Sequence, residues 1–235
     1  MKNISKNFFI HNQINHNMEN EKSLTQETIM KAMDWAYEKA VNGNGVPGID
    51  SAEEIANNYL KGNDSLIVKV NRLIRWQNTK AGTSGFVTGI PGLLSMPITL
   101  PANITSVLFV QIRMIAAIAK MGGYDIKDDR VKSIVFACLV ANSVSDVTKQ
   151  VGIKVGKKMA ENALKKMSTD ILKSINQKVG FKLFTKFGEK GVINIAKTIP
   201  FLGGIIGGLF DIISTNTVGN IARDTFLSKE ESYNR

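Results

Sequence analysis

The chain has 235 residues, of which 43% are hydrophobic and 21% are charged, and it carries a formal net charge of +10. A chain of this length can bury a sizeable core without disulfides or metal ions, and its hydrophobic share is too high for a disordered protein. The single cysteine, Cys138, excludes an intramolecular disulfide and zinc sites built from several cysteines. Both histidines, His11 and His16, lie in a polar amino-terminal segment, so we expect no histidine-dependent triad, no metal site and no cofactor.

The two ends of the chain differ in composition from its middle. Residues 1–22 are mostly polar, and the apolar piece Phe8–Ile10 is too short for a secretory signal. We interpret residues 1–22 as a flexible arm, residues 23–228 as one helical domain and residues 229–235 as a polar tail. Without a signal or a cysteine pair, we expect a cytoplasmic protein, with peripheral contact at the inner face of the cell membrane. The abundance of lysine, asparagine and isoleucine is typical of an AT-rich, bacterial genome.

Helical periodicity runs through most of the chain, because apolar residues recur every three or four positions and no segment alternates as a strand would. Capping boxes at Ser23–Gln26 and Ser51–Glu54 each predict a helix start. Asp64 and Asp128 are suited to the positive end of a helix dipole. The predicted helices are 25–42, Ser51 to about Lys61, one that begins at Asp64, 102–121, and Asp128 to about Val147. The fold class is therefore all-α.

Two segments, 84–119 and 198–213, are unusually hydrophobic but are punctuated by glycine and proline. Neither offers the about 20 consecutive apolar residues that a membrane-spanning helix needs. We interpret them as Gly/Pro-interrupted central helices of a single-domain helical bundle. The alternative is a membrane-active hairpin, in which glycines four residues apart, such as Gly203 and Gly207, tighten the contacts between helices.

Patterns that carry catalysis are weak. The glycines from Gly85 to Gly92 lack the Gly-Lys-Ser/Thr ending of a phosphate loop. Asp125, Asp128 and Asp129 can bind a cation or act as acid and base, but three acids at a turn are more typical of a helix start. Cys138 lies on an apolar helical face and is interpreted as an inert thiol.

Charged residues inside the hydrophobic segments suggest a buried polar site. Arg113 and Asp211 each interrupt a strongly apolar run, and a buried charge is costly unless it is paired. We therefore consider a polar site formed by Arg113 and Asp211, with Arg223 as another partner for Asp211. The alternative is that Arg113 extends to the surface and Asp211 caps a helix break.

The basic charge is concentrated in residues 149–197, which hold twelve lysines and three acidic residues. This segment is predicted to form one amphipathic helix or a pair, with a phenylalanine-rich piece after Gly180. Its face is either solvated or binds anionic lipid. We do not expect nucleic acid as its partner, because the segment has no arginine and no interleaved aromatics for stacking on bases. The lysines outside the apolar stripe are Lys154, Lys158, Lys165, Lys166 and Lys173.

The order of several glycine- and proline-rich blocks resembles the EcsC protein family over residues 27–228. The blocks are Thr88–Leu93, a helix with Gln111, Arg113 and Ile115, Gly122–Asp125, Lys197–Gly208, Gly219–Arg223 and Phe226. The family takes its name from a bacterial gene cluster that encodes an ABC transporter ATPase and its membrane partner. The resemblance therefore implies a membrane-linked or transporter-accessory role, and it implies no catalytic residues.

Together these features favour a non-enzymatic, membrane-associated accessory protein. It would bind an anionic membrane surface, a hydrophobic ligand or a membrane or transporter partner through its lysine face and its apolar helices. The alternatives are a helical hydrolase that uses carboxylates such as Asp125 and Asp211, and a helical interaction scaffold. The sequence leaves the oligomeric state open.

Overall fold

The structure is a computed structural model, and it describes residues 25–43, 49–81, 102–140, 164–187 and 205–227. These residues form seven helices and no strand, which confirms the all-α fold of a single domain. The helices are α2 (Gln26–Asn42), α3 (Ala52–Leu60), α4 (Leu66–Ala81), α6 (Ala102–Met121), α7 (Asp129–Cys138), α10 (Thr169–Phe187) and α12 (Ile205–Phe226). The predicted arm and tail, residues 1–22 and 229–235, lie outside the described residues.

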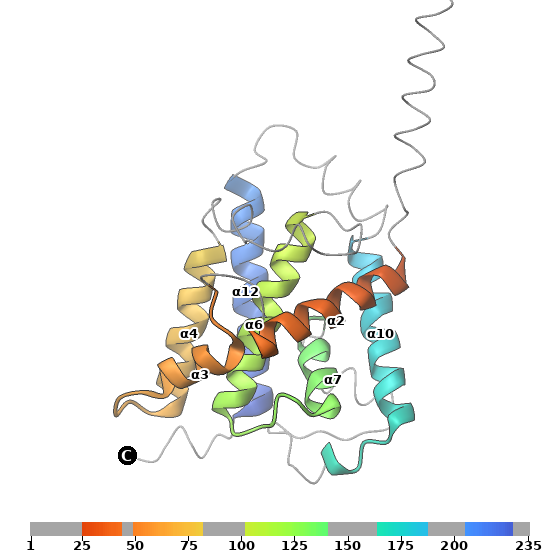
Figure 1. The fold of residues 1–235 in the computed structure, drawn as a ribbon. Coiled ribbons are helices and arrows are strands. Elements are labelled where there is room, and N and C mark those ends of the chain that lie inside the picture. The colour runs from red at the N-terminus through yellow and green to blue at the C-terminus, as the bar shows by residue number, and fades with distance from the viewer. Residues whose placement is uncertain (1–24, 44–48, 82–101, 141–163, 188–204, 228–235) are drawn as a thin grey trace, which may run out of the picture.

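Helix α6 is the centre of the bundle (Figure 1). It packs against α2, α3, α4, α7 and α12, and every residue from Leu108 to Ala119 is buried. The prediction that this hydrophobic segment forms a central helix is therefore confirmed for residues 102–121. Helices α4 and α10 lie at opposite edges of the bundle, and α2 crosses between α6 and α10 (Figure 1).

Helix α12 is the second central helix, and it runs in the same direction as α6. Gln111 donates a hydrogen bond to Thr215 at 3.3 Å, and further along the pair Gly122 faces the carbonyl of Phe226. Helix α12 continues from Ile205 through two glycines without a break, so the expected interruption of this segment is wrong for that part of it. Within the described residues, no helix combines the length and the apolar character that a membrane crossing requires.

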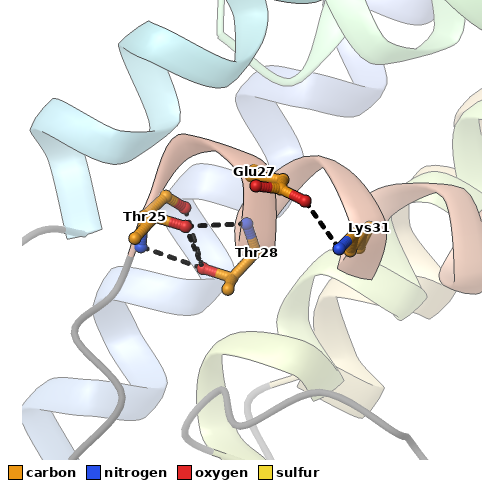
Figure 2. Close-up of polar contacts among 4 residues, drawn as sticks. All are labelled: Thr25, Glu27, Thr28 and Lys31. Atoms are coloured by element: carbon orange, nitrogen blue, oxygen red, sulfur yellow. Dashed lines mark hydrogen bonds and ion pairs between the residues drawn. The ribbon is translucent and has the colours of Figure 1, made fainter.

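The amino-terminal ends of α3 and α2 show how well capping patterns in the sequence predict a helix start. Ser51 and Glu54 form the predicted capping box, with hydrogen bonds of 3.1 Å and 2.7 Å in the two directions. Helix α2 is capped by Thr25 and Thr28 instead of Ser23 and Gln26 (Figure 2). A threonine at the third helical position thus takes the role that the sequence pattern gives to a glutamine or glutamate.

Two other helix ends differ from the predictions. Helix α4 begins at Leu66, and Asp64, two residues earlier, pairs with Arg72. Helix α7 begins with Asp128 as its predicted cap but ends at Cys138, well before the predicted end near Val147. Residues 141–147 lie outside those described.

Two glycines permit close contacts between helices. A Cβ atom on Gly219 of α12 would lie 2.9 Å from the Ile74 side chain on α4. A Cβ atom on Gly180 of α10 would lie 2.9 Å from Met30 on α2. Of the two alternatives, one helix or a pair, the structure shows a single helix at Gly180, because α10 passes through this glycine and approaches α2 there.

Candidate functional site

The outer face of α10 is the part of the described structure that matches the predicted lysine surface. Ser168 caps the helix by accepting a 3.4 Å hydrogen bond from the amide of Ile171. The residues buried on the inner side include Ile175, Val179 and Leu183. The exposed side follows a four-residue spacing: Lys173, Gln177, Phe181 and Thr185. Residues four apart are neighbours on a helix, so these side chains form one continuous outer row.

The predicted lysines are only partly within the described residues. Lys165 and Lys166, in the turn that precedes α10, are exposed, as is Lys173. Lys154 and Lys158 lie outside the described residues. The three described lysines therefore occupy the amino-terminal half of the α10 region.

Sequence reasoning missed three residues of this face. Phe181 is 57% exposed, and the half-buried Lys178 and Lys182 lie beside it. We call the set Lys165, Lys166, Lys173, Lys178, Phe181 and Lys182 the α10 face. The four-residue spacing from Lys173 through Gln177 to Phe181 lies outside the apolar stripe and could have identified the phenylalanine as exposed.

Helix α2 and helix α7 hold the α10 face in place from behind. The side-chain amide of Gln26 donates a 2.8 Å hydrogen bond to the backbone carbonyl of Gln177. Gly180, one turn further, is in close contact with Met30. The part of the α10 face from Lys173 to Lys182 is therefore carried by a helix whose other side is packed, and not by an irregular loop.

Arg113 is buried, as the sequence analysis considered, but its described contacts point away from α12. The side chain is 4% exposed, and its guanidinium lies 5.3 Å from the centre of the Phe109 ring. Its Nη1 donates a 3.2 Å hydrogen bond to the backbone carbonyl of Asp50, whereas its Nε has no hydrogen-bond partner. Burial lowers the pKa of Arg113 to about 10, and the Asp50 carboxylate acts in the opposite direction. The guanidinium thus remains charged at neutral pH.

Arg223 has different partners, so the structure does not bring the two arginines into one site. Its Nη1 donates to Asn71 at 2.8 Å and to Asn220 at 3.0 Å. Asp211 lies twelve residues earlier on the same helix, about 18 Å along the axis, so it does not pair with Arg223. The side chain of Asp211 is outside those described, and its pairing with Arg113 stays a prediction.

The acidic turn before α7 has a structural role. Asp128 accepts a 2.8 Å hydrogen bond from the amide of Arg130, and Asp125 accepts one of 2.9 Å from the amide of Lys127. Among the described residues, no group of three or more acidic, histidine or cysteine side chains is arranged to hold a metal ion. The interpretation of this cluster as a helix start is confirmed for Asp128, which caps α7.

Cys138 is fully buried and free. Burial raises the pKa of its thiol to about 12, although a hydrogen bond with Thr225 acts in the opposite direction. Because the thiolate is the reactive form of cysteine, this thiol is unreactive at neutral pH, as the sequence predicts.

A surface hollow of about 480 Å³ lies between the end of α2 and the start of α3, and two of its lining residues are carboxylates. Glu53 pairs with Lys120 at 2.7 Å, and this contact lowers the pKa of Glu53. Glu54 accepts hydrogen bonds from Ser51, which lower the pKa of Glu54. A general acid at neutral pH needs a raised pKa, so neither carboxylate is suited to that role.

The chain belongs to the EcsC protein family, whose model matches residues 6–227. The match begins earlier than the resemblance seen in the sequence, which starts at residue 27, and it includes most of the segment interpreted as an arm. Neither the curated proteins nor the solved structures contain a significant match to the chain.

Proposed function

We propose that this EcsC-family protein is a non-enzymatic accessory protein that binds an anionic membrane surface through the α10 face. The observation that carries the proposal is the exposed phenyl ring of Phe181, with the half-buried Lys178 about one turn before it and the half-buried Lys182 next in sequence, on a helix whose inner side is packed. A hydrophobic side chain among lysines is the arrangement with which interfacial helices bind lipid.

The charge of the segment supports a negatively charged surface as the partner. Residues 164–187 contain six lysines and a single acidic residue, Asp170. Each lysine close to an anionic membrane contributes about 1 kcal/mol of attraction. Transfer of a phenylalanine ring out of water adds at most about 1.5–3 kcal/mol. Together these contributions suffice for reversible peripheral binding.

The accessory role extends the same proposal. The family resemblance links proteins of this kind to a transporter and its membrane subunit, and a chain held at the membrane surface would be placed beside such a partner. The hydrolase alternative has less support, since the described carboxylates Glu53 and Glu54 have lowered pKa values and Asp125 does not line the hollow.

Flotation of the full chain with lipid vesicles tests the proposal. We expect the protein to float with phosphatidylcholine vesicles that contain phosphatidylserine, and not with phosphatidylcholine alone, at low salt. Replacing Lys165, Lys166 and Lys173 with glutamine should weaken binding about 100-fold, from about 1 kcal/mol for each lysine.

A matched triple variant provides the control. Lys31, Lys61 and Lys127 are exposed lysines outside the α10 face, and their replacement with glutamine changes the net charge equally. We expect this variant to retain most of the binding. Equal flotation with both kinds of vesicle, or equal losses in the two triple variants, would contradict the proposal.

A further inference from the structure

Three further exposed hydrophobic side chains lie on α3 and α4. Among the described residues, four large hydrophobic side chains are exposed, and only Phe181 belongs to the α10 face. The other three are Leu60 at the end of α3, 38% exposed, and Val68 and Trp76 on α4, 40% and 50% exposed. Val68, Arg72 and Trp76 follow at four-residue spacing, so the two apolar side chains share one side of α4 with an arginine between them.

The exposed side of α4 is a single narrow stripe. The exposed residues recur every three or four positions: Val68, Arg72, Arg75, Trp76 and Thr79. The opposite side is buried, with Val70, Leu73 and Ile74 among the residues packed toward α6 and α12. We call the set Leu60, Val68, Arg72, Arg75 and Trp76 the Trp76 face.

The cations of this face are arginines. Arg72 forms an ion pair with Asp64 at 2.6 Å while remaining half exposed, so one arginine of this face already binds a carboxylate. Arginine binds carboxylates with a planar pair of donors, whereas lysine acts as a compact charge. Tryptophan and arginine are also the residues that most often dominate the binding energy of protein interfaces.

The position of α4 separates this face from the proposed lipid contact. Helix α4 packs against α12, α6 and α3, whereas α10 packs against α2 and α7. The two helices lie at opposite edges of the bundle (Figure 1). A flat bilayer that contacts the outer side of α10 therefore does not reach the outer side of α4.

We propose that the Trp76 face docks an acidic, amphipathic helical segment of a protein partner. Trp76 and Val68 would contact the apolar side of that segment, and Arg72 and Arg75 would pair with its carboxylates. This inference does not depend on lipid binding by the α10 face, and it specifies the chemistry of a partner that the family resemblance leaves undefined.

A defined peptide tests this proposal with the full chain. The probe is a fluorescently labelled helical peptide of leucine and glutamate, and a second peptide carries lysine in place of glutamate. Fluorescence anisotropy should show binding of the acidic peptide and at least about tenfold weaker binding of the basic one. Trp76→Ala and Arg75→Glu should each weaken the binding of the acidic peptide by about 10- to 30-fold, the size typical of dominant interface residues.

Two controls separate the docking role from folding. Phe181→Ala removes the exposed aromatic side chain of the α10 face and should leave peptide binding unchanged. Circular dichroism should show that Trp76→Ala retains the helical content and melting temperature of the unaltered chain, because half of that side chain is already exposed.

Four outcomes would overturn the proposal. They are equal binding of the two peptides, unchanged binding in both α4 variants, concentration-dependent self-association that Trp76→Ala abolishes, and vesicle flotation that requires Trp76 and Arg75. The last two results would assign the face to a second copy of the chain or to lipid.

Discussion

The two exposed faces of this bundle use different residues on helices that are built in a similar way. Both α4 and α10 bury one side and expose a row of residues at three- or four-residue spacing. The α10 face combines lysines with a phenylalanine, and the Trp76 face combines arginines with a tryptophan. Lysine is suited to diffuse attraction by a charged surface, and arginine to paired hydrogen bonds with a carboxylate. We therefore propose a different kind of partner for each face.

The glycines at which α4 and α10 contact a neighbouring helix should respond differently to replacement by alanine. This is the largest effect on stability that we expect. Gly219→Ala places a methyl group against the branched, buried Ile74, while Gly180→Ala places it against the flexible Met30. We expect the first variant to lower the free energy of unfolding by about 1–3 kcal/mol, from overpacking. The second should change it by less than about 1 kcal/mol, because Met30 can move and alanine favours a helix. Urea denaturation measures both.

Equal losses of stability in the two glycine variants would show that α10 is packed as rigidly as α4. In that case the comparison of a firmly packed α4 with a more adaptable α10 would fail. A vesicle-flotation measurement on Gly180→Ala adds a second readout, since the α10 face itself is unaltered and binding should be retained.

Removing the amino-terminal cap of α2 should increase amide hydrogen exchange in α2 and α10 but not in α4. Thr25→Ala removes the hydroxyl that accepts a hydrogen bond from the amide of Thr28 (Figure 2), and the expected cost is about 1 kcal/mol. The adjacent Gln26 holds α10 through Gln177, so amide hydrogen exchange should increase in the first turn of α2 and around Gly180. Exchange in α4 serves as the internal control and should not change. A uniform increase over both helices would mean that the two faces are not supported independently.

The smallest expected effect concerns the charge of the Trp76 face. Asp64→Asn removes the partner of Arg72, and an exposed ion pair of this kind contributes only about 0.2–1 kcal/mol to stability. The melting temperature should change little. The affinity for the acidic peptide should rise about two- to threefold, because Arg72 becomes available to the peptide. A loss of peptide affinity would mean that Asp64 orients Arg72 and does not compete with the partner.

The fold could be predicted from the sequence further than the sites could. The box at Ser51 and Glu54, the cap at Asp128 and the buried helix 102–121 were each correct because they depend on residues close together in the chain. The cap of α2 was placed two residues too early, at Ser23 instead of Thr25, because a threonine pair took the place of the usual pattern. The sequence left open whether one helix or two pass Gly180, because a glycine that permits close helix packing looks, in sequence, like one that ends a helix.

The candidate sites were harder to predict because exposure depends on packing. The three described lysines Lys165, Lys166 and Lys173 were found as an exposed set, whereas Phe181 and Trp76 were not singled out. An aromatic residue at helical spacing is usually part of a core, and periodicity alone does not show which side of a helix lacks a neighbour. Of the two alternatives for Arg113, burial is confirmed, but its hydrogen-bond partner is a backbone carbonyl, which the pattern of side chains in the sequence does not reveal.

The sequence by itself determined the helical class, the central position of α6, the inert character of Cys138 and the concentration of lysine charge before and within α10. These features follow from local periodicity, capping and composition, which act between residues a few positions apart. The tertiary structure decided that Phe181 and Trp76 are exposed, that their helices lie at opposite edges, and that Arg113 and Arg223 have separate partners. Those outcomes depend on which helix covers which face, and that depends on the packing of residues far apart in the chain.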